Sequence, residues 1–378
     1  MSRSPFGLEE ARRQLAVCAA CRYCEGYCAV FPALERRPIL LEGDVAQLAN
    51  LCHDCRACYQ ACMYAPPHEF AVDVPALLGG ARMDSYERFA WPRRLAWAFR
   101  HPSAAVAGAT AAGLVLAFGV ALANRGLAGT PAGPGAFYAV VPYLAMLVPA
   151  LVVSAFSLAV LAAGFVRLWG AAGGDVRELL DGRLWLAATW EALSLRWLGG
   201  GGGGCHYPDR ERPSSARRVL HVLVVGGLAL AFAATVAAAV LQDLLGRLPP
   251  YSVLSAPVLL GTLGGAAIVA GCTGLLVLKP AAGADLASGR SRSLDRAFLG
   301  ALEVSAITGM LTLALRDTAA LGPALAVHLG SLAALYVTAP YGKLVHGIYR
   351  LAALLRDVEE RRRERAAAPG AAGGRGSR

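Results

Sequence analysis

Charged residues are scarce in this chain of 378 residues. Asp, Glu, Lys and Arg together make up 16% of it, whereas hydrophobic residues make up 56%. The mean hydropathy of +0.48 is too high for an ordinary soluble protein. The shortage of charge therefore excludes a wholly soluble enzyme and predicts a membrane domain.

Acidic residues are fewer than basic ones, 26 against 36, which leaves a net charge of +10. The arginines lie beside apolar stretches, where they act as signals for membrane topology and as contacts for lipid headgroups. We therefore expect membrane lipid, and no nucleic acid, among the partners.

Two common signals are missing as well. Residues 1–17 carry charges throughout and contain no apolar core, which predicts that there is no secretory signal peptide. The six glycines 199–204 follow no strand pattern and form no G-x-G-x-x-G motif, so we recognise no flavin or nicotinamide site. This glycine loop is either a flexible linker or a place where backbone N–H groups hold a propionate, a quinone headgroup or a partner's surface.

Cysteine, by contrast, is plentiful near the N-terminus. Eight of the ten cysteines form two copies of C-x2-C-x2-C-x3-C, namely Cys18, Cys21, Cys24 and Cys28, and then Cys52, Cys55, Cys58 and Cys62. This run ligates [4Fe-4S] clusters, and in two-cluster ferredoxins the fourth cysteine crosses to the other cluster. The spacing therefore predicts two clusters, one on Cys18, Cys21, Cys24 and Cys62, and the other on Cys52, Cys55, Cys58 and Cys28.

A structural zinc site or a disulfide framework is the alternative interpretation of these cysteines. Zinc needs four ligands, usually from two separated pairs, so two complete runs exceed its requirement. Thiolate-ligated clusters also favour a reducing compartment, which predicts a cytoplasmic domain. Bacterial ferredoxins place proline directly after the fourth cysteine, whereas Pro32 and Pro66 come four residues later here, so we expect a helical ferredoxin module. Cys205 and Cys272 lie outside both runs and are interpreted as small structural residues.

The predicted fold is mainly α, with a small two-cluster ferredoxin-like domain followed by a six-helix transmembrane bundle. Residues 1–85 form the cluster domain, and the mixture of Trp and Arg in 86–102 is typical of a segment at the lipid headgroups. The membrane domain covers 103–350 and contains a cytoplasmic loop, 169–218. Residues 351–378 are expected to be a disordered cytoplasmic tail. Six apolar stretches are long enough to span a bilayer, at about 103–123, 138–168, 219–241, 255–278, 297–315 and 323–347.

Arginine and lysine gather in the second and fourth connections between these stretches. The positive-inside rule then places both connections, the N-terminus and the C-terminus in the cytoplasm, as an even number of spans requires. The expected location is the bacterial inner membrane.

Two histidines in the apolar stretches are candidate ligands of a b-type haem. His221 begins the third span and His346 ends the sixth, which runs in the opposite direction, so both are expected at the same cytoplasmic depth. An imidazole pair of this kind binds haem iron, whose propionates favour nearby cations. The candidate cations are Arg217, Arg218 and Lys343. Interfacial or hydrogen-bonded histidines are the alternative.

A second haem would need a further pair of ligands. His328 shares a helical face with His346, about 27 Å away along a continuous helix, and Met310 is the candidate partner of His328. His101 and His206 are fallback ligands in less fixed positions. Pro340 either bends the last helix to aim His346 or is an ordinary membrane-helix proline. Glu303, inside the fifth span, is a candidate for proton uptake at a quinone site.

Six stretches of the chain resemble the tricarballylate/citrate utilisation protein B family of membrane iron-sulfur and haem proteins. They are CAACRYCEGYC, CHDCRACYQACMYAPPHEFAVDVP, GGGGGGCHYPDRERPSSARR, PVLLGTLGG, ALRDTAALG and VHLGSLAALYVTAPYGKLVHGIYR. The last stretch is also similar to the final haem helix of the nitrate reductase gamma subunit, where two haems are held. One of that family's four ligands is absent here, so only the haem at His221 carries over.

The resemblance implies an electron-transfer subunit of a flavoprotein:quinone oxidoreductase. A separate FAD dehydrogenase would oxidise a tricarballylate- or citrate-type substrate, and this chain would pass its electrons through both clusters and the haem to quinone. A related flavin-fused protein acts in cobalamin synthesis, so a flavin-dependent step there is an alternative source of electrons. The remaining alternative is a membrane-bound iron-sulfur redox sensor or anchor.

Overall fold

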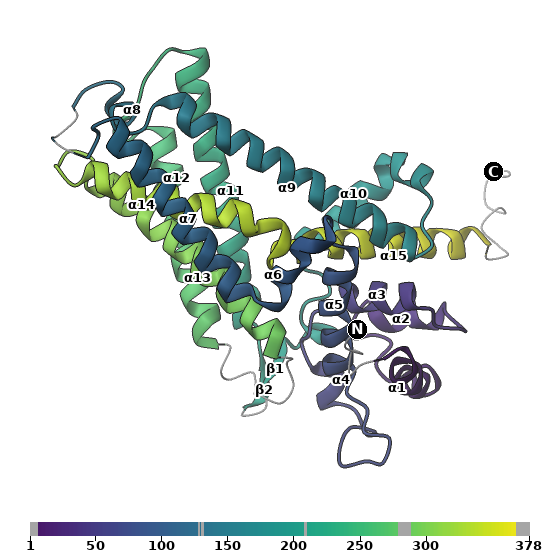
Figure 1. The fold of residues 1–378 in the computed structure, drawn as a ribbon. Coiled ribbons are helices and arrows are strands. Elements are labelled where there is room, and N and C mark those ends of the chain that lie inside the picture. Colours follow the sequence, from purple (N-terminus) through teal and green to yellow (C-terminus); the bar gives the residue numbers. More distant parts are fainter. Residues whose placement is uncertain (1–6, 128, 130–131, 208–209, 279–288, 368–378) are drawn as a thin grey trace, which may run out of the picture.

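A computed structural model describes residues 7–127, 129, 132–207, 210–278 and 289–367. Most of this is helical, and Figure 1 shows a long-helix bundle with a group of short helices packed beside one end of it. The first five helices form this small domain, which confirms the predicted helical module. They are α1 (Leu8–Cys21), α2 (Val30–Glu35), α3 (Glu42–Leu51), α4 (Ala57–Gln60) and α5 (Val74–Phe89).

Short helical elements connect the small domain to the bundle. They are η1 (Arg93–Ala96) and α6 (Trp97–Arg100), within the predicted interfacial segment. Trp91 and Trp97 are exposed there, as expected for side chains at the level of lipid headgroups. Phe99 is fully buried against Tyr86 of α5, so the connection is fixed to the small domain.

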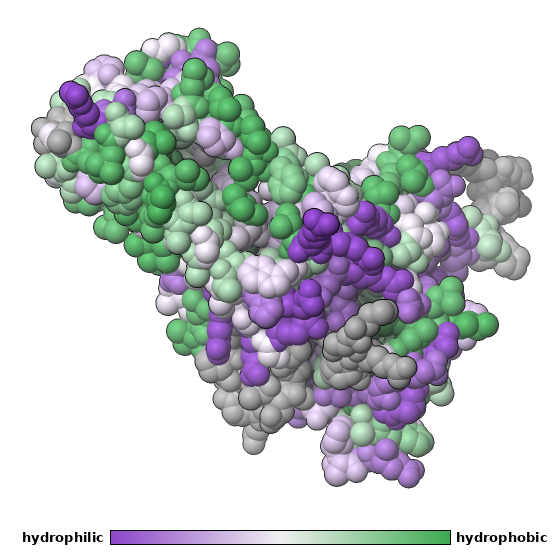
Figure 2. Space-filling model, viewed as in Figure 1, coloured by the Kyte–Doolittle hydropathy of each residue, from purple (hydrophilic) through white to green (hydrophobic). Residues whose placement is uncertain are grey.

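Six helical segments are long and apolar enough to cross a membrane, as predicted. The segments contain α7 (Pro102–Ala123), α9 (Tyr143–Ala171), α11 (Ala216–Ala239) with η4 (Val240–Leu244), α12 (Ala256–Leu278), α13 (Gly289–Ala314) and α14 (Leu321–Thr338). Their apolar side chains face outward, and Figure 2 shows hydrophobic residues over the bundle and hydrophilic ones over the small domain. A short α8 (Ala136–Val140) precedes α9.

Glycine allows the closest helix pairs of the bundle to form. Gly227 of α11 and Gly264 of α12 approach through their backbones, and a Cβ on either would clash with the other helix. Gly113 of α7 meets Gly330 of α14 in the same way. In lipid there is no hydrophobic driving force between helices, so the close van der Waals packing that small residues allow at such crossings stabilises the bundle.

The last apolar stretch is not one continuous helix. α14 ends at Thr338, η6 (Ala339–Tyr341) follows, and α15 (Val345–Ala367) begins after an extended Gly342. Pro340 has no N–H to donate and clashes with the preceding turn, which explains the break. The prediction that His328 and His346 share the face of one helix is therefore wrong.

The prediction of a disordered tail from residue 351 is also wrong for the part that the structure describes. α15 continues to Ala367 and buries one side, including Ala352, Leu355 and Val358. Its charges pair with each other and with the small domain, so they do not mark a solvated tail. The tail prediction for 368–378 lies outside the described residues.

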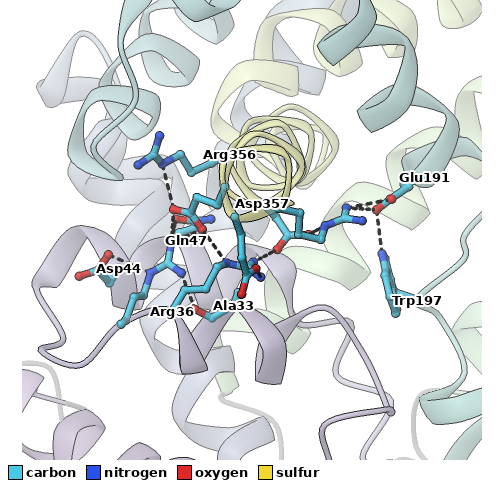
Figure 3. Close-up of polar contacts among 12 residues, drawn as sticks. Ala33, Arg36, Asp44, Gln47, Glu191, Trp197, Arg356 and Asp357 are labelled. Atoms are coloured by element: carbon cyan, nitrogen blue, oxygen red, sulfur yellow. Dashed lines mark hydrogen bonds and ion pairs between the residues drawn. The ribbon is translucent and has the colours of Figure 1, made fainter. Parts of the chain in front are cut away.

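An ion-pair network joins α15 to the small domain (Figure 3). Asp357 is 1% exposed and contacts the Arg36 guanidinium at the end of α2. Arg37 Nη2 donates to Glu360 Oε1 at 2.7 Å, and its Nε donates to Asp44 Oδ1 at 2.9 Å. The C-terminal helix is thus held by residues near the N-terminus.

The connection between α9 and α11 completes the other side of this network. It contains η2 (Val176–Leu180), α10 (Gly182–Leu193), η3 (Gly200–Gly202) and an antiparallel hairpin of β1 (Cys205–Tyr207) and β2 (Arg210–Ser214). Glu191 of α10 accepts hydrogen bonds from Arg361 Nη2 at 2.9 Å and Trp197 Nε1 at 3.0 Å. α10 therefore packs along α15, as Figure 1 shows.

Candidate redox site

The first predicted set of cysteines lines one cavity in the small domain. Cys18, Cys21, Cys24 and Cys62 surround it together with Tyr23, Met63, Phe31 and Val72. Burial, followed by the charges of the other three cysteines, raises the pKa of Cys18 to about 12. Burial first, and then the charges of Cys62 and Cys21, raise the pKa of Cys24 to about 11. Cys62 therefore lies with the first run, as the crossed arrangement requires.

The second set gathers in the same manner. Burial raises the pKa of Cys58, and the next largest causes are the neighbouring Cys52, Cys28 and Cys55. Burial also raises the pKa of Cys28, and Cys52 is the next largest cause. Cys24 of the first set acts weakly on Cys58, so the two sets are neighbours.

The donor set fits a cluster better than a single ion. Within the described ranges no three His, Cys, Asp or Glu side chains converge on one metal position. A cubane places each of its four thiolates on a different iron, so its ligands surround a volume and do not converge. Four thiols around an apolar cavity meet that requirement. Each set would hold one [4Fe-4S] cluster.

The glycine loop packs against the second set. Gly201 donates its N–H to the Tyr27 carbonyl at 3.0 Å, and the following hairpin donates from His206 N to the Cys55 carbonyl at 2.9 Å. Gly200 has a φ of +50°, and a Cβ there would overlap the Cβ of Ala57 and lie 3.4 Å from Cys55 Sγ. Cys205 is buried in this contact beside Cys55. The loop therefore covers a cysteine site, an arrangement that neither of its sequence interpretations included.

His221 of α11 and His346 of α15 lie opposite each other. Their ring centroids are 6.2 Å apart, and the ring planes are inclined by 60°. His346 Nδ1 is 2.5 Å from the Lys343 carbonyl, so Nδ1 donates and Nε2 is left to accept. Metal-bound histidines commonly use their second ring nitrogen in this way.

These two rings fit the axial positions of a haem. A metal about 2.0 Å from each coordinating nitrogen, as is typical of imidazole ligands, would put the two ring centroids about 6 Å apart. The observed separation matches. The structure thus brings together the predicted pair, and its role as the haem ligands stays a prediction.

The loop that carries Cys52 is attached to both histidine helices. Arg217, one turn before His221 on α11, donates from Nη1 to the Asp54 carbonyl at 2.7 Å. Arg350, one turn after His346 on α15, donates from Nη2 to the Cys52 carbonyl at 2.8 Å. Arg350 was missed by sequence reasoning, although its spacing of four from His346 places both on one helical face.

His53 completes this contact, and sequence reasoning missed it too. Its Nε2 lies against Arg350 Nη1, and a guanidinium can only donate, so Nε2 accepts and the proton is on Nδ1. Burial first, and then the charges of Arg350, Arg217 and Arg82, lower the pKa of His53 well below its usual value. His53 is therefore a neutral imidazole. The only sequence feature that could have indicated a role for His53 is its position between two cysteines of the second run.

The three predicted propionate cations all have partners within the protein. Arg217 bonds to Asp54 as described, Arg218 Nη2 donates to the Ser194 carbonyl at 3.1 Å, and Lys343 Nζ pairs with Asp295 Oδ1 at 2.7 Å. A role at propionates stays a prediction for each of them.

The candidates for a second haem do not face each other. His328 packs over Gly309, with its Nδ1 3.2 Å from Thr308 Oγ1, whereas Met310 packs against Gly265 of α12. A second haem on His328 and Met310 thus stays a prediction that needs rearrangement. Glu303 accepts a hydrogen bond from Thr273 of α12.

The fallback and structural residues are placed as follows. His101 caps the start of α7 with its ring beside Trp97, and His206 lies on β1. Cys272 is fully buried in the bundle on α12. None of these three is brought to the His221 and His346 pair by a contact that the structure describes.

Two family models match the chain, and between them they cover most of it. "Citrate utilization protein B" matches residues 98–367, and "Citrate utilization protein B Fer4-like domain" matches residues 11–88. The chain belongs to the citrate utilization protein B family. It is also 40% identical over 360 residues to citrate utilization protein B of Escherichia coli, with 94% of this chain and 93% of that protein covered.

Family membership confirms the resemblance seen in the sequence. The Fer4-like match coincides with α1 to α5 and with all eight cysteines of the two runs, which supports iron-sulfur electron transfer. The second match covers the six apolar segments and α15. No solved structure matches the chain.

Proposed function

We propose that this chain is the membrane subunit that re-oxidises a partner FAD dehydrogenase and delivers the electrons to quinone. Clusters and haem supply one-electron storage, which a two-electron flavin needs in order to discharge stepwise. The observation that carries the proposal is the attachment of the Cys52 loop, through Arg350 and Arg217, to the two helices that bear His346 and His221.

The chain's residues define an order of sites. Cys18, Cys21, Cys24 and Cys62 would hold the cluster that receives electrons, in a cavity beside the exposed Tyr23 and Met63. Cys28, Cys52, Cys55 and Cys58 would hold the next one, covered by the glycine loop. His221 and His346 would hold a single b-type haem.

The partner and location follow from the family and the charge pattern. The relative's name refers to citrate utilization, so we propose a dehydrogenase that oxidises citrate or a related tricarboxylate such as tricarballylate. The arginine-rich connections support a cytoplasmic position for the small domain and both termini, with the bundle in the inner membrane of a bacterium. Glu303, in the fifth apolar segment, is the candidate for proton supply to the quinone.

Absorption spectroscopy tests the proposal. Anaerobically purified protein should contain eight irons in two clusters, which comes from four per cubane, together with a haem whose α band appears on reduction. His346→Ala should abolish that band while the clusters remain. A protein with clusters and no haem would favour a redox sensor or anchor.

Cys58→Ala tests the route of the electrons. Haem content should stay intact, but reduction of the haem by substrate and the FAD dehydrogenase should be lost. Unchanged reduction would remove the clusters from the pathway. Cys272→Ala is the matched control, because this buried cysteine lies in the bundle outside both sets.

A further inference from the structure

Two arginines connect a predicted cluster ligand to the two predicted haem ligands in the same way. Arg217 is four residues before His221 on α11, and Arg350 is four residues after His346 on α15. Residues four apart on a helix lie on one face, about 6 Å apart along the axis. Each histidine thus has a guanidinium one turn away on its own face.

Both guanidiniums bind the same short segment of backbone. Arg350 Nη2 donates to the carbonyls of Leu51 at 3.2 Å and Cys52 at 2.8 Å, and its Nη1 contacts His53. Arg217 Nη1 donates to the Asp54 carbonyl at 2.7 Å. The segment 51–54, which includes the cysteine ligand, is therefore held from both histidine helices at once.

The hydrogen-bond partners that the structure describes for these two guanidiniums are neutral. They are three carbonyl oxygens and the neutral imidazole of His53. Arg82, which donates to the Ala49 carbonyl at 2.9 Å, adds a third positive charge close to His53. Like charges gathered in a buried place are costly unless a negative charge lies nearby. The carboxylates of Asp54 and Asp295 supply part of that negative charge near Arg217. A cluster with four thiolate ligands would carry further negative charge beside Arg350.

We propose that Arg350 and Arg217 are positioning residues that fix the cluster at Cys52 relative to the haem between His221 and His346. The proposal rests on the function proposed above. The transfer that these residues would serve takes one electron from a reduced cluster to an oxidised haem, and it requires no proton. Its rate falls steeply with the distance between the two groups, so a backbone clamp shared by both sets of ligands maintains the rate. The positive charges also favour the reduced form of each group, which raises its reduction potential.

The substitutions that test the proposal separate charge from geometry. Arg350→Gln removes the charge and the planar guanidinium. Arg350→Lys keeps the charge, but its ammonium group cannot bind two carbonyls and an imidazole from one planar group. Arg316→Gln is the matched control, because Arg316 Nη1 also donates to a backbone carbonyl, that of Tyr251 at 2.8 Å, and has no proposed role at a cluster or a haem.

We expect three results from full-length protein with its clusters and haem. In Arg350→Gln the haem potential falls, and reduction of the haem through the clusters slows about tenfold, a factor that corresponds to about 1.4 kcal/mol. In Arg350→Lys the potential is kept but the reduction is slow. Hydrogen exchange of the amides in 51–54 speeds up in both Arg350 variants and not in Arg316→Gln.

Contrary results are distinguishable from a failure of the proposed function. If wild-type protein holds no haem or no clusters, the proposed function fails. If wild-type protein holds both and Arg350→Gln leaves the potential, the rate and the hydrogen exchange unchanged, only the positioning role fails. Should Arg350→Gln not assemble, Arg350→Lys and Arg217→Gln decide the matter by the same measurements.

Discussion

Gly200 offers the sharpest test of how the glycine loop protects a cluster site. Its φ of +50° lies in the left-handed region, and an added Cβ would overlap Ala57 and press on Cys55 Sγ. The left-handed conformation costs an alanine about 1–2 kcal/mol. Overpacking adds about 1–3 kcal/mol. Gly200→Ala should therefore lift the loop at a cost of about 2–5 kcal/mol.

The neighbouring Gly201 provides the matched control. Its φ of +81° gives an alanine a similar backbone cost, but its Cβ would meet the Tyr27 ring only at an ordinary 3.6 Å. Gly201→Ala should thus show the conformational cost alone, about 1–2 kcal/mol. The difference between the variants isolates the close contact with Ala57 and Cys55.

The assay is the loss of cluster absorbance in air. An opening made easier by 1.4 kcal/mol occurs about tenfold more often. The overpacking cost of about 1–3 kcal/mol should therefore make Gly200→Ala bleach about fivefold to somewhat over a hundredfold faster than Gly201→Ala. Iron content before exposure must be equal in the two proteins. Equal bleaching of both variants and wild-type protein would show that the loop does not shield the second cysteine set.

Three further substitutions test other parts of the structure. Asp357→Asn breaks the buried pair with Arg36 and should lower the free energy of unfolding by about 3–5 kcal/mol. The control Asp181→Asn keeps its helix cap, loses an exposed pair with Arg362 and should cost at most about 1 kcal/mol. Thermal unfolding in detergent compares the two variants, and equal losses of stability would contradict the role of the ion-pair network. Gly113→Ala should destabilise the protein by about 1–3 kcal/mol, because the added Cβ would clash with the backbone of Gly330. The control Gly108→Ala should have no such effect, because the space around Gly108 is open. A similar melting temperature for both variants would exclude the close crossing of α7 and α14. Arg13 lowers the pKa of Glu10 to about 2, so the contribution of the Glu10 carboxylate to stability is present above pH 4.5 and is lost as the pH falls towards 2. The difference in free energy of unfolding between wild type and Glu10→Gln should therefore shrink over that interval, and a constant difference would contradict the pairing.

Much of this protein could be predicted because single residues or periodic runs carry the signal. The cysteine spacing identified the small domain, and uninterrupted apolar stretches located the six spans. His221 and His346 could be paired from the order and direction of the spans alone. Their rings lie together in the structure.

The rest depended on contacts between segments that are distant in the sequence. The charges of α15 were interpreted as those of a solvated tail. Their partners Arg36, Arg37 and Glu191 lie far away in the sequence, so no local pattern indicates these contacts. The glycine run could not be assigned, because its partners Tyr27 and Cys55 belong to another domain. Pro340 was recognised as a potential bend, but the additional effect of Gly342 in breaking the helix was not.

The grip of Arg36 and Arg37 on α15 has a consequence for biogenesis. A ribosome releases the cysteine domain early, since chains fold from the N-terminus during synthesis. The helix that it must dock on emerges only after every apolar segment has been inserted. The contacts of Arg36 and Arg37 with this helix therefore form last, after the small domain and the rest of the bundle have been synthesised.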